Sequence, residues 1–353
     1  MEQKIYNEYV EILKEELLPA MGCTEPIAVA YAAAVAVQAL GEKPESVEVN
    51  VSANIIKNVK SVVVPCTGGL RGIGAAVCAG IVAGCPEKEL EILEEITGEQ
   101  KVEMKKMLDT MPMTIRESDK GYIFDIQIKA CAGGHSGYVE IAGFHTNVIC
   151  VKKDDEIIRE KAYEEQGSSC ATDRSLLTVE KIIEFADCVD VADVEEVLQR
   201  QIDYNWAIAE EGMTGNWGAA IGKTLMEAYG NSVHNRAKAM AAAGSDARMN
   251  GCELPVVINS GSGNQGMTTS LPVIVYAKEL NVSKEMMLRA LVVSNLITIH
   301  MKTGIGRLSA YCGAISAGCG AGAGICYLYG GRAYEISHVI VNAVAINSGV
   351  VCD

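Results

Sequence analysis

The sequence predicts an α+β protein in which a mainly helical part, made from the two ends of the chain, is interrupted by an inserted α/β segment. Apolar residues have helical spacing in residues 3–40 and again from about residue 175 onward. Between them, β-branched stretches alternate with Gly-rich turns. The 353 residues also exceed one typical domain. We therefore expect a discontinuous helical domain of residues 1–43 plus 170–353 and an inserted α/β domain of residues 44–169.

Composition narrows the class of protein. Apolar residues make up 49% of the chain, enough for a sizeable core, whereas aromatic residues are only 5%. The net charge of −15 argues against nucleic acid as a partner and against attraction to an anionic membrane. The chain has 13 cysteines and opens on a polar segment without a signal peptide, so we expect a cytoplasmic protein with reduced thiols.

The N-terminal half alternates between helix and strand signals. An amphipathic helix is expected at residues 3–20, and an Ala- and Val-rich helix, uncharged after Glu25 and therefore buried, at 25–40. The segments that follow are one or two strands within 46–64, an apolar helix with Gly at 72–84, an acidic helix at 87–110 and three strands within 121–152.

The C-terminal half is dominated by helices. Two loops rich in Gly, Asn and Ser are expected at 243–252 and 259–267, and a helix at 283–300. Residues 308–331 carry no charge and are long enough for a membrane span. Because they are rich in Gly, poor in Leu and Ile and without a clear aromatic or basic belt, we interpret them as a buried helix of a soluble protein.

Most of the cysteines are expected to be small core residues. Cys312, Cys319 and Cys326 are seven residues apart, so on one helix neighbours lie about 10.5 Å apart and cannot serve one metal cluster. Cys23 differs because it directly precedes the buried helix, where a helix N-terminus stabilises a thiolate. That position suits a metal ligand or a nucleophile, and a cysteine that merely packs is the alternative.

Five ordered segments resemble one known family. They are residues 21–28 (MGCTEPIA), 245–249 (SDARM), 259–266 (NSGSGNQG), 307–312 (RLSAYC) and 351–353 (VCD). Together they resemble the L-cysteine desulfidase family, which is related to the alpha part of the iron–sulfur L-serine dehydratases. The resemblance runs from the first helices to the last residue.

The resemblance implies a 4Fe-4S cluster bound by Cys23, Cys312 and Cys352. The family pattern has a further cysteine seven residues after the third, a position beyond Asp353, so the source of that ligand stays open. The reaction implied is β-elimination from L-cysteine to sulfide, ammonia and pyruvate, with an open cluster iron as Lewis acid. Residues near both chain ends would then belong to one helical, cluster-binding domain.

The substrate would be an amino acid, whose carboxylate needs hydrogen-bond donors. Within the Gly-rich segment, Ser260, Ser262 and Asn264 offer side-chain donors beside backbone N–H groups. Arg248 and Arg307 are candidate carboxylate clamps. An ordinary turn and surface arginines are the alternative interpretation.

The remaining roles are an amine-binding group and a general base. Glu25 could bind the substrate amine or only stabilise the start of its helix. His145, in a Phe-His-Thr-Asn segment that resembles a family block, is the leading candidate for the base, ahead of His300 and Lys302. A structural, hydrogen-bonded histidine is the alternative for each.

Several functions remain open at this stage. An L-serine dehydratase would use the same mechanism. A cofactor-free thiol enzyme would use Cys23 as its nucleophile, and an amino-acid-binding protein without a cluster would catalyse nothing. The sequence does not decide whether the chain forms a homo-oligomer.

Overall fold

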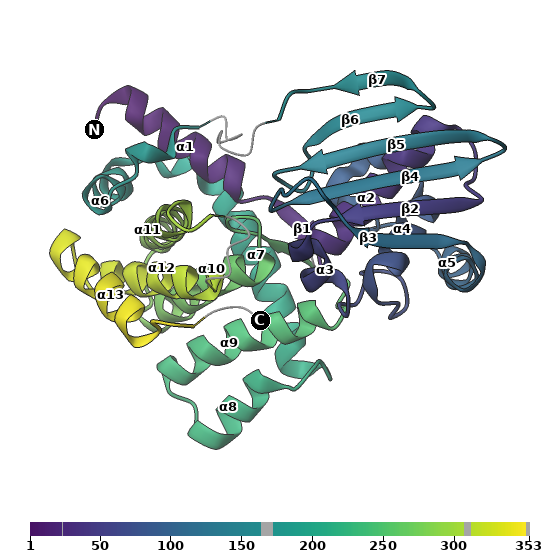
Figure 1. Cartoon of the computed structure of the whole chain (residues 1–353). Helices are drawn as coiled ribbons and strands as arrows, with labels where there is room; N and C mark the ends of the chain where they lie inside the picture. Colours follow the sequence, from purple (N-terminus) through teal and green to yellow (C-terminus); the bar gives the residue numbers. More distant parts are fainter. Residues whose placement is uncertain (23, 164–171, 307–311, 351–353) are drawn as a thin grey trace. The chain divides into compact units, whose positions relative to one another are not determined.

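A computed structural model describes residues 1–22, 24–163, 172–306 and 312–350 of the chain (Figure 1). The described chain divides into two compact units. Unit 1 comprises Met1–Ala20, Cys170–Arg248 and Leu254–Asp353, and unit 2 comprises Met21–Ser169 and Met249–Glu253. Helices dominate the first and a mixed sheet the second, so the predicted α+β class is confirmed.

The unit division differs from the expected domain boundary at residues 43/44. Helix α2 (Thr24–Leu40) belongs to unit 2, because it packs on helix α4 (Gly72–Ala83) and on the sheet. It is buried almost throughout, as its uncharged sequence predicts.

Unit 2 contains a six-stranded sheet in the order β3-β2-β4-β5-β6-β7. β2 and β3 run parallel, and every other neighbouring pair is antiparallel. The strands are β2 (Ser46–Val51), β3 (Met113–Glu117), β4 (Asp125–Ala132), β5 (His135–Ala142), β6 (Val148–Lys153) and β7 (Glu156–Glu160). The remaining helices of the unit are α3 (Ala53–Val59), the 3-10 helix η1 (Pro86–Glu91) and α5 (Gly98–Thr110).

One face of the sheet is apolar. Val49 of β2 pairs with Ile128 of β4, which pairs with Val139 of β5, and all three are buried. The alternation of the strands therefore directs one set of side chains toward the helices, as a half-buried antiparallel sheet requires.

The backbone of helix α2 is in direct contact with the backbone at two glycines, Gly80 and Gly137. A Cβ at Gly80 of α4 would stand 1.9 Å from the Ala30 carbonyl oxygen, and a Cβ at Gly137 of β5 would stand 2.1 Å from that of Ala36. No side chain fits at either position. The many Gly and Ala residues thus allow the backbone of one element to pack directly against the backbone of another.

Of the one or two strands expected within 46–64, the structure has one, β2. Residues 53–59 form helix α3 in place of a second strand, so local β-branched composition is overridden there by tertiary context. The expected helix at 87–110 is a 3-10 turn followed by α5, which begins at a capping box between Thr97 and Gln100.

Unit 1 is built from helices around a large apolar core. These are α1 (Gln3–Glu16), α6 (Val179–Cys188), α7 (Glu195–Thr214), α8 (Ile221–Tyr229), α9 (Val233–Met249), α10 (Gly263–Glu279), α11 (Lys284–Thr303), α12 (Gly313–Leu328) and α13 (Ala333–Ile346). Two 3-10 turns, η2 (Arg174–Leu176) and η3 (Val191–Asp193), connect them, and β1 (Pro19–Met21) pairs with β8 (Pro255–Val257).

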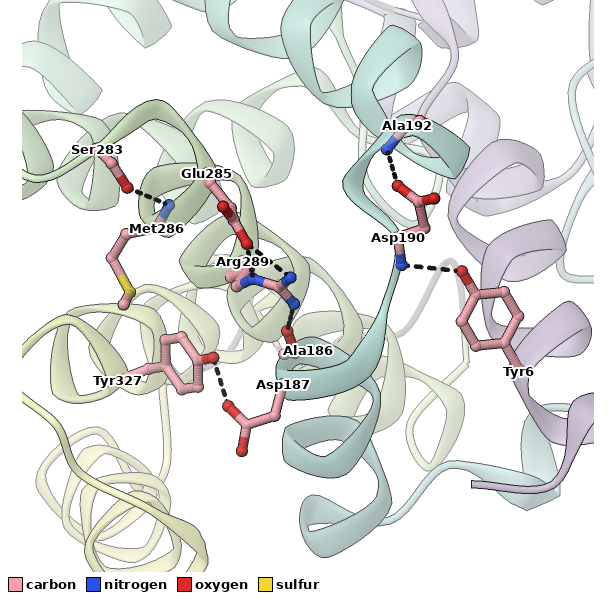
Figure 2. A network of polar contacts seen from close by, with 10 residues as sticks. All are labelled: Tyr6, Ala186, Asp187, Asp190, Ala192, Ser283, Glu285, Met286, Arg289 and Tyr327. Atoms are coloured by element: carbon pink, nitrogen blue, oxygen red, sulfur yellow. Dashed lines mark hydrogen bonds and ion pairs between the residues drawn. The ribbon is translucent and has the colours of Figure 1, made fainter.

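Polar contacts fix the C-terminal end of α6 to its neighbours (Figure 2). The Tyr327 hydroxyl donates to Asp187 over 2.6 Å, and Arg289 Nη1 donates to the Ala186 carbonyl over 2.5 Å. Beyond the helix, the backbone N–H of Asp190 donates to the Tyr6 hydroxyl. These contacts join α12, α11 and α1 to one short segment of chain.

The uncharged stretch at 308–331 contains α12, a helix of 16 residues. In the ranges that the structure describes, no helix is long and apolar enough to cross a membrane.

A substitution tests the backbone contact between α2 and α4. Gly80→Ala should lower the free energy of unfolding by about 3 kcal/mol, because the new methyl group overlaps the Ala30 carbonyl. Gly98→Ala, at the open first position of α5 with no atom within 4 Å, is the matched control and should change it by less than about 1 kcal/mol. Urea unfolding of both variants measures the difference, and equal stabilities would contradict the contact.

Candidate functional site

A tight turn joins β8 to α10 in unit 1. Asn259 and Ser262 exchange two backbone hydrogen bonds of 3.1 Å. Between them, Ser260 and Gly261 have φ values of 51° and 79°, the conformation of a type I′ turn. A left-handed conformation is unfavourable for serine, so the surroundings must impose it.

Buried amides hold this turn in place. The Asn259 side chain, fully buried, donates to Asn295 Oδ1 of α11 over 2.9 Å. Asn295 in turn exchanges hydrogen bonds of 2.8 and 3.0 Å with the fully buried Gln201 of α7. The remaining acceptor, Asn259 Oδ1, accepts from the Ser260 hydroxyl over 2.9 Å. The oxygen and nitrogen of all three amides thus have partners, which makes a buried polar network stabilising and rigid.

A fourth buried amide, Asn205, holds the strand before the turn. Asn205 of α7 accepts from the Val257 N–H over 2.8 Å and donates to the Val257 carbonyl and to the Ser270 hydroxyl. A Cβ at Gly266 would stand 2.1 Å from the same Val257 carbonyl oxygen. The first turn of α10 therefore lies directly against β8.

Arg248 lies against the same turn of α10. Its guanidinium is buried, and Nη1 donates to Asn264 Oδ1 over 3.0 Å. A Cβ at Gly263 would stand 2.4 Å from Arg248 Nε, so only glycine lets the guanidinium reach this position. The predicted carboxylate clamp and one predicted donor are thus in contact.

Two expected loops are partly helical. Asp246 and Arg248 lie in α9, which continues to Met249, and α10 begins at Gly263, immediately after the turn. Helix α9 is stabilised by close packing, since a Cβ at Gly212 of α7 would stand 2.0 Å from the Ala243 carbonyl oxygen. Composition alone therefore gave a wrong prediction at 243–249.

Cys312 lies beside this arrangement. It is the N-cap residue of α12, is half-buried and forms no disulfide. A Cβ at the next residue, Gly313, would stand 2.3 Å from Gln265 Nε2 of α10. The N-terminal ends of α10 and α12 therefore meet at Gln265, and both ends favour negative charge.

Gln265 itself was not singled out from the sequence, although it lies in the segment 259–266. It is buried, and within the described ranges its Oε1 has no hydrogen-bond partner. A buried acceptor of this kind is rare in folded proteins and marks a place where a further polar group fits.

Of the remaining predicted site residues that the structure describes, Glu25 and His145 belong to unit 2, and His300 and Lys302 belong to α11 of unit 1. The Glu25 carboxylate accepts from the Thr24 hydroxyl over 3.1 Å and from Asn58 Nδ2 over 3.3 Å. This supports its helix-start role and leaves its role toward substrate a prediction. Partial burial lowers the pKa of His300, with an opposing influence from Glu180.

His145 lies in the turn between β5 and β6. It is 9% exposed, and its ring meets that of Phe124 edge to face at 4.9 Å. Asn147 shapes the turn, because its amide donates to the Ala142 carbonyl over 2.8 Å. The structure thus gives His145 a fixed position, and its role as a base stays a prediction.

Cys23, Arg307 and Cys352 lie outside the described residues. Of the three predicted cluster ligands, the structure therefore describes Cys312 alone. Across the described ranges, no group of three or more His, Cys, Asp or Glu residues is arranged to hold a metal ion.

Comparison with known proteins decides the family. The family model for the serine dehydratase alpha chain matches residues 87–353, which include Arg248, the turn and Cys312. The chain belongs to the serine dehydratase alpha chain family. Its predicted relation to the alpha part of serine dehydratases is thereby confirmed.

Relatives in this family extend the similarity to the first residues. UPF0597 proteins of Desulfitobacterium hafniense and Lachnoclostridium phytofermentans are 57% and 50% identical over 352 residues, 100% and 99% of this chain. The matches cover 82% and 84% of those relatives. A UPF0597 protein of Treponema denticola is 43% identical over 360 residues, 100% of this chain and 83% of the relative.

The buried amides make a testable contribution to stability. Asn295→Ala removes the side chain that bonds both Gln201 and Asn259 at a fully buried position, so the free energy of unfolding should fall by about 3 kcal/mol. Gln199→Ala removes an exposed hydrogen bond to Asp203 on the same α7 and should cost less than about 0.5 kcal/mol. If urea unfolding finds the two variants equally stable, the network does not hold the turn.

Proposed function

We propose that this protein is a lyase that eliminates the β-substituent of a small amino acid, with L-cysteine as substrate and sulfide, ammonia and pyruvate as products. The observation that carries the proposal is the meeting of Arg248, the first turn of α10 and the N-cap residue Cys312 in one place. Family membership supports the reaction class.

The donor chemistry at Cys312 fits an iron–sulfur cluster. Its sulfur is half-buried, is not tied in a disulfide and stands at a helix N-terminus, where a thiolate ligand is stabilised. We propose Cys23 and Cys352 as the other ligands of a 4Fe-4S cluster, on the sequence resemblance. The chemistry such a cluster supplies when bound is Lewis-acid assistance to the departing sulfur.

The chain's own residues bind and orient the substrate. Arg248 and the N-terminal N–H groups of α10 provide a positive surface for the carboxylate, with Ser262 and Asn264 as further donors. The third predicted donor, Ser260, is buried and its hydroxyl already donates to Asn259 Oδ1 over 2.9 Å, so it shapes the turn instead. The Ser262 side chain does not cap its own helix, so it is not committed to that role. The rigid turn beneath keeps these donors in fixed positions.

The remaining steps are a proton transfer and amine binding. We propose His145 as the base that removes the α-proton and Glu25 as the group that binds the ammonium, both on the sequence resemblance. Arg307 stays a second candidate for the carboxylate.

L-Serine is the second candidate substrate, and the family to which the chain belongs favours it. A thiolate is a softer ligand than a hydroxyl group and suits cluster iron better, which favours L-cysteine on chemical grounds. Initial rates of pyruvate formation from each amino acid, with sulfide measured alongside, decide between them.

Loss of one ligand tests the cluster. After anaerobic reconstitution the parent should bind about four irons per chain, and Cys312→Ala should lose most of them together with sulfide release. Cys319→Ala is the matched control on the same α12. Cys319 is fully buried and burial raises the pKa of its thiol, so this variant should keep its iron. No iron in the parent, or equal iron in both variants, would contradict the cluster.

Replacement of the guanidinium tests carboxylate binding separately. Arg248→Lys keeps the charge but loses the planar fork, so kcat/KM should fall about 100-fold while iron content stays unchanged. Arg116→Lys, on exposed β3, should leave kcat/KM at the parent value. A normal kcat/KM for Arg248→Lys would remove Arg248 from the substrate site.

A further inference from the structure

A cavity lies in unit 1 between helices α7, α8, α9 and α10. Its volume is about 350 Å³, within the range of small-molecule sites. Its apolar wall is formed by Trp206 and by three methionines, Met213, Met226 and Met240. Methionine side chains adapt to the shape of an apolar ligand, and an indole ring offers a flat contact surface.

One cation borders this apolar wall without a carboxylate partner. The Lys278 ammonium lies 3.1 Å from the centre of the Trp206 ring. Among the described residues it forms neither an ion pair nor a hydrogen bond. Desolvation lowers the pKa of Lys278, and the negative charge of Glu210 opposes this effect.

The other cation of the cavity is already neutralised. Arg236 forms an ion pair with Glu279 and donates from Nη1 to the Asn231 carbonyl over 2.9 Å. The cavity therefore combines an apolar interior with a positive charge at Lys278. The ligand that complements both has an apolar body and one negative group.

The cavity is separate from the candidate active site. Lys278 follows Asn264 by 14 residues in α10, which places the two about 21 Å apart along the helix. Arg236 precedes Arg248 by 12 residues in α9, or about 18 Å. The two helices thus carry the substrate-binding residues at one end and the cavity at the other.

We infer that this cavity binds a small monocarboxylate with a branched or aromatic apolar body, its carboxylate at Lys278 and its apolar part against Trp206 and the methionines. The inference concerns binding alone and does not depend on the proposed lyase reaction.

Tryptophan fluorescence tests the inference directly. The chain has two tryptophans, so Trp217→Phe leaves Trp206 as the only reporter, in the wall of the cavity. Titration with 4-methylpentanoate should give a saturable change in emission with a Kd below about 1 mM. The alcohol 4-methylpentan-1-ol has the same apolar body without the charge and should bind at least about tenfold more weakly.

Charge removal provides the second comparison. In the same background, Lys278→Met keeps the aliphatic chain and should weaken 4-methylpentanoate binding at least about tenfold, whereas Lys238→Met, exposed on α9, should not. The rise in melting temperature on ligand addition gives a readout independent of the indole. No saturable change up to about 10 mM, or equal affinity for acid and alcohol or in both lysine variants, would overturn the inference.

Discussion

The arrangement of unit 1 depends on the mutual hydrogen bonding of three buried amides, Gln201, Asn259 and Asn295. None of the three side chains reaches water, so each donor and acceptor must find a partner inside the protein. Their partners lie on α7, on α11 and on the turn after β8. The positions of these elements are therefore coupled, and the strained turn is held by its surroundings.

Small residues let the neighbouring helices come close enough for this network. A Cβ at Gly320 of α12 would stand 2.1 Å from the Thr298 hydroxyl and 2.4 Å from the Ser294 carbonyl oxygen of α11. The hydroxyls of α11 bond back to nearby carbonyls, as in Ser294 to Thr269 over 2.7 Å. The scarcity of aromatic residues thus reflects a core in which backbones and short polar side chains are in direct contact.

Much of this was predictable from the sequence. Apolar spacing predicts α1, a long uncharged run of Ala and Val predicts α2, and the Gly-rich segment predicts the turn at 259–262. Helix α3 was not predictable, since its residues favour a strand locally. The amide network also joins residues that are 36 and 94 positions apart in the sequence, and no local sequence pattern predicts contacts over such separations. The one sequence feature that could have indicated the network is Asn295, a polar side chain within the apolar part of α11.

The discontinuity of unit 1 has a consequence for how the chain acquires its structure during synthesis. Tyr9 of α1 packs on Phe185 of α6, with ring centres 5.2 Å apart, and α1 also contacts α11. The first helix therefore leaves the ribosome long before its partners, whereas nearly all of unit 2 is one continuous segment, Met21–Ser169. Unit 2 can form while the rest is still being made, whereas α1 must wait for α6, near the middle of the chain, and for α11, in its last third. The apolar side chains of α1, among them Tyr9, Ile12 and Leu13, therefore stay without their packing partners until those later helices have been synthesised.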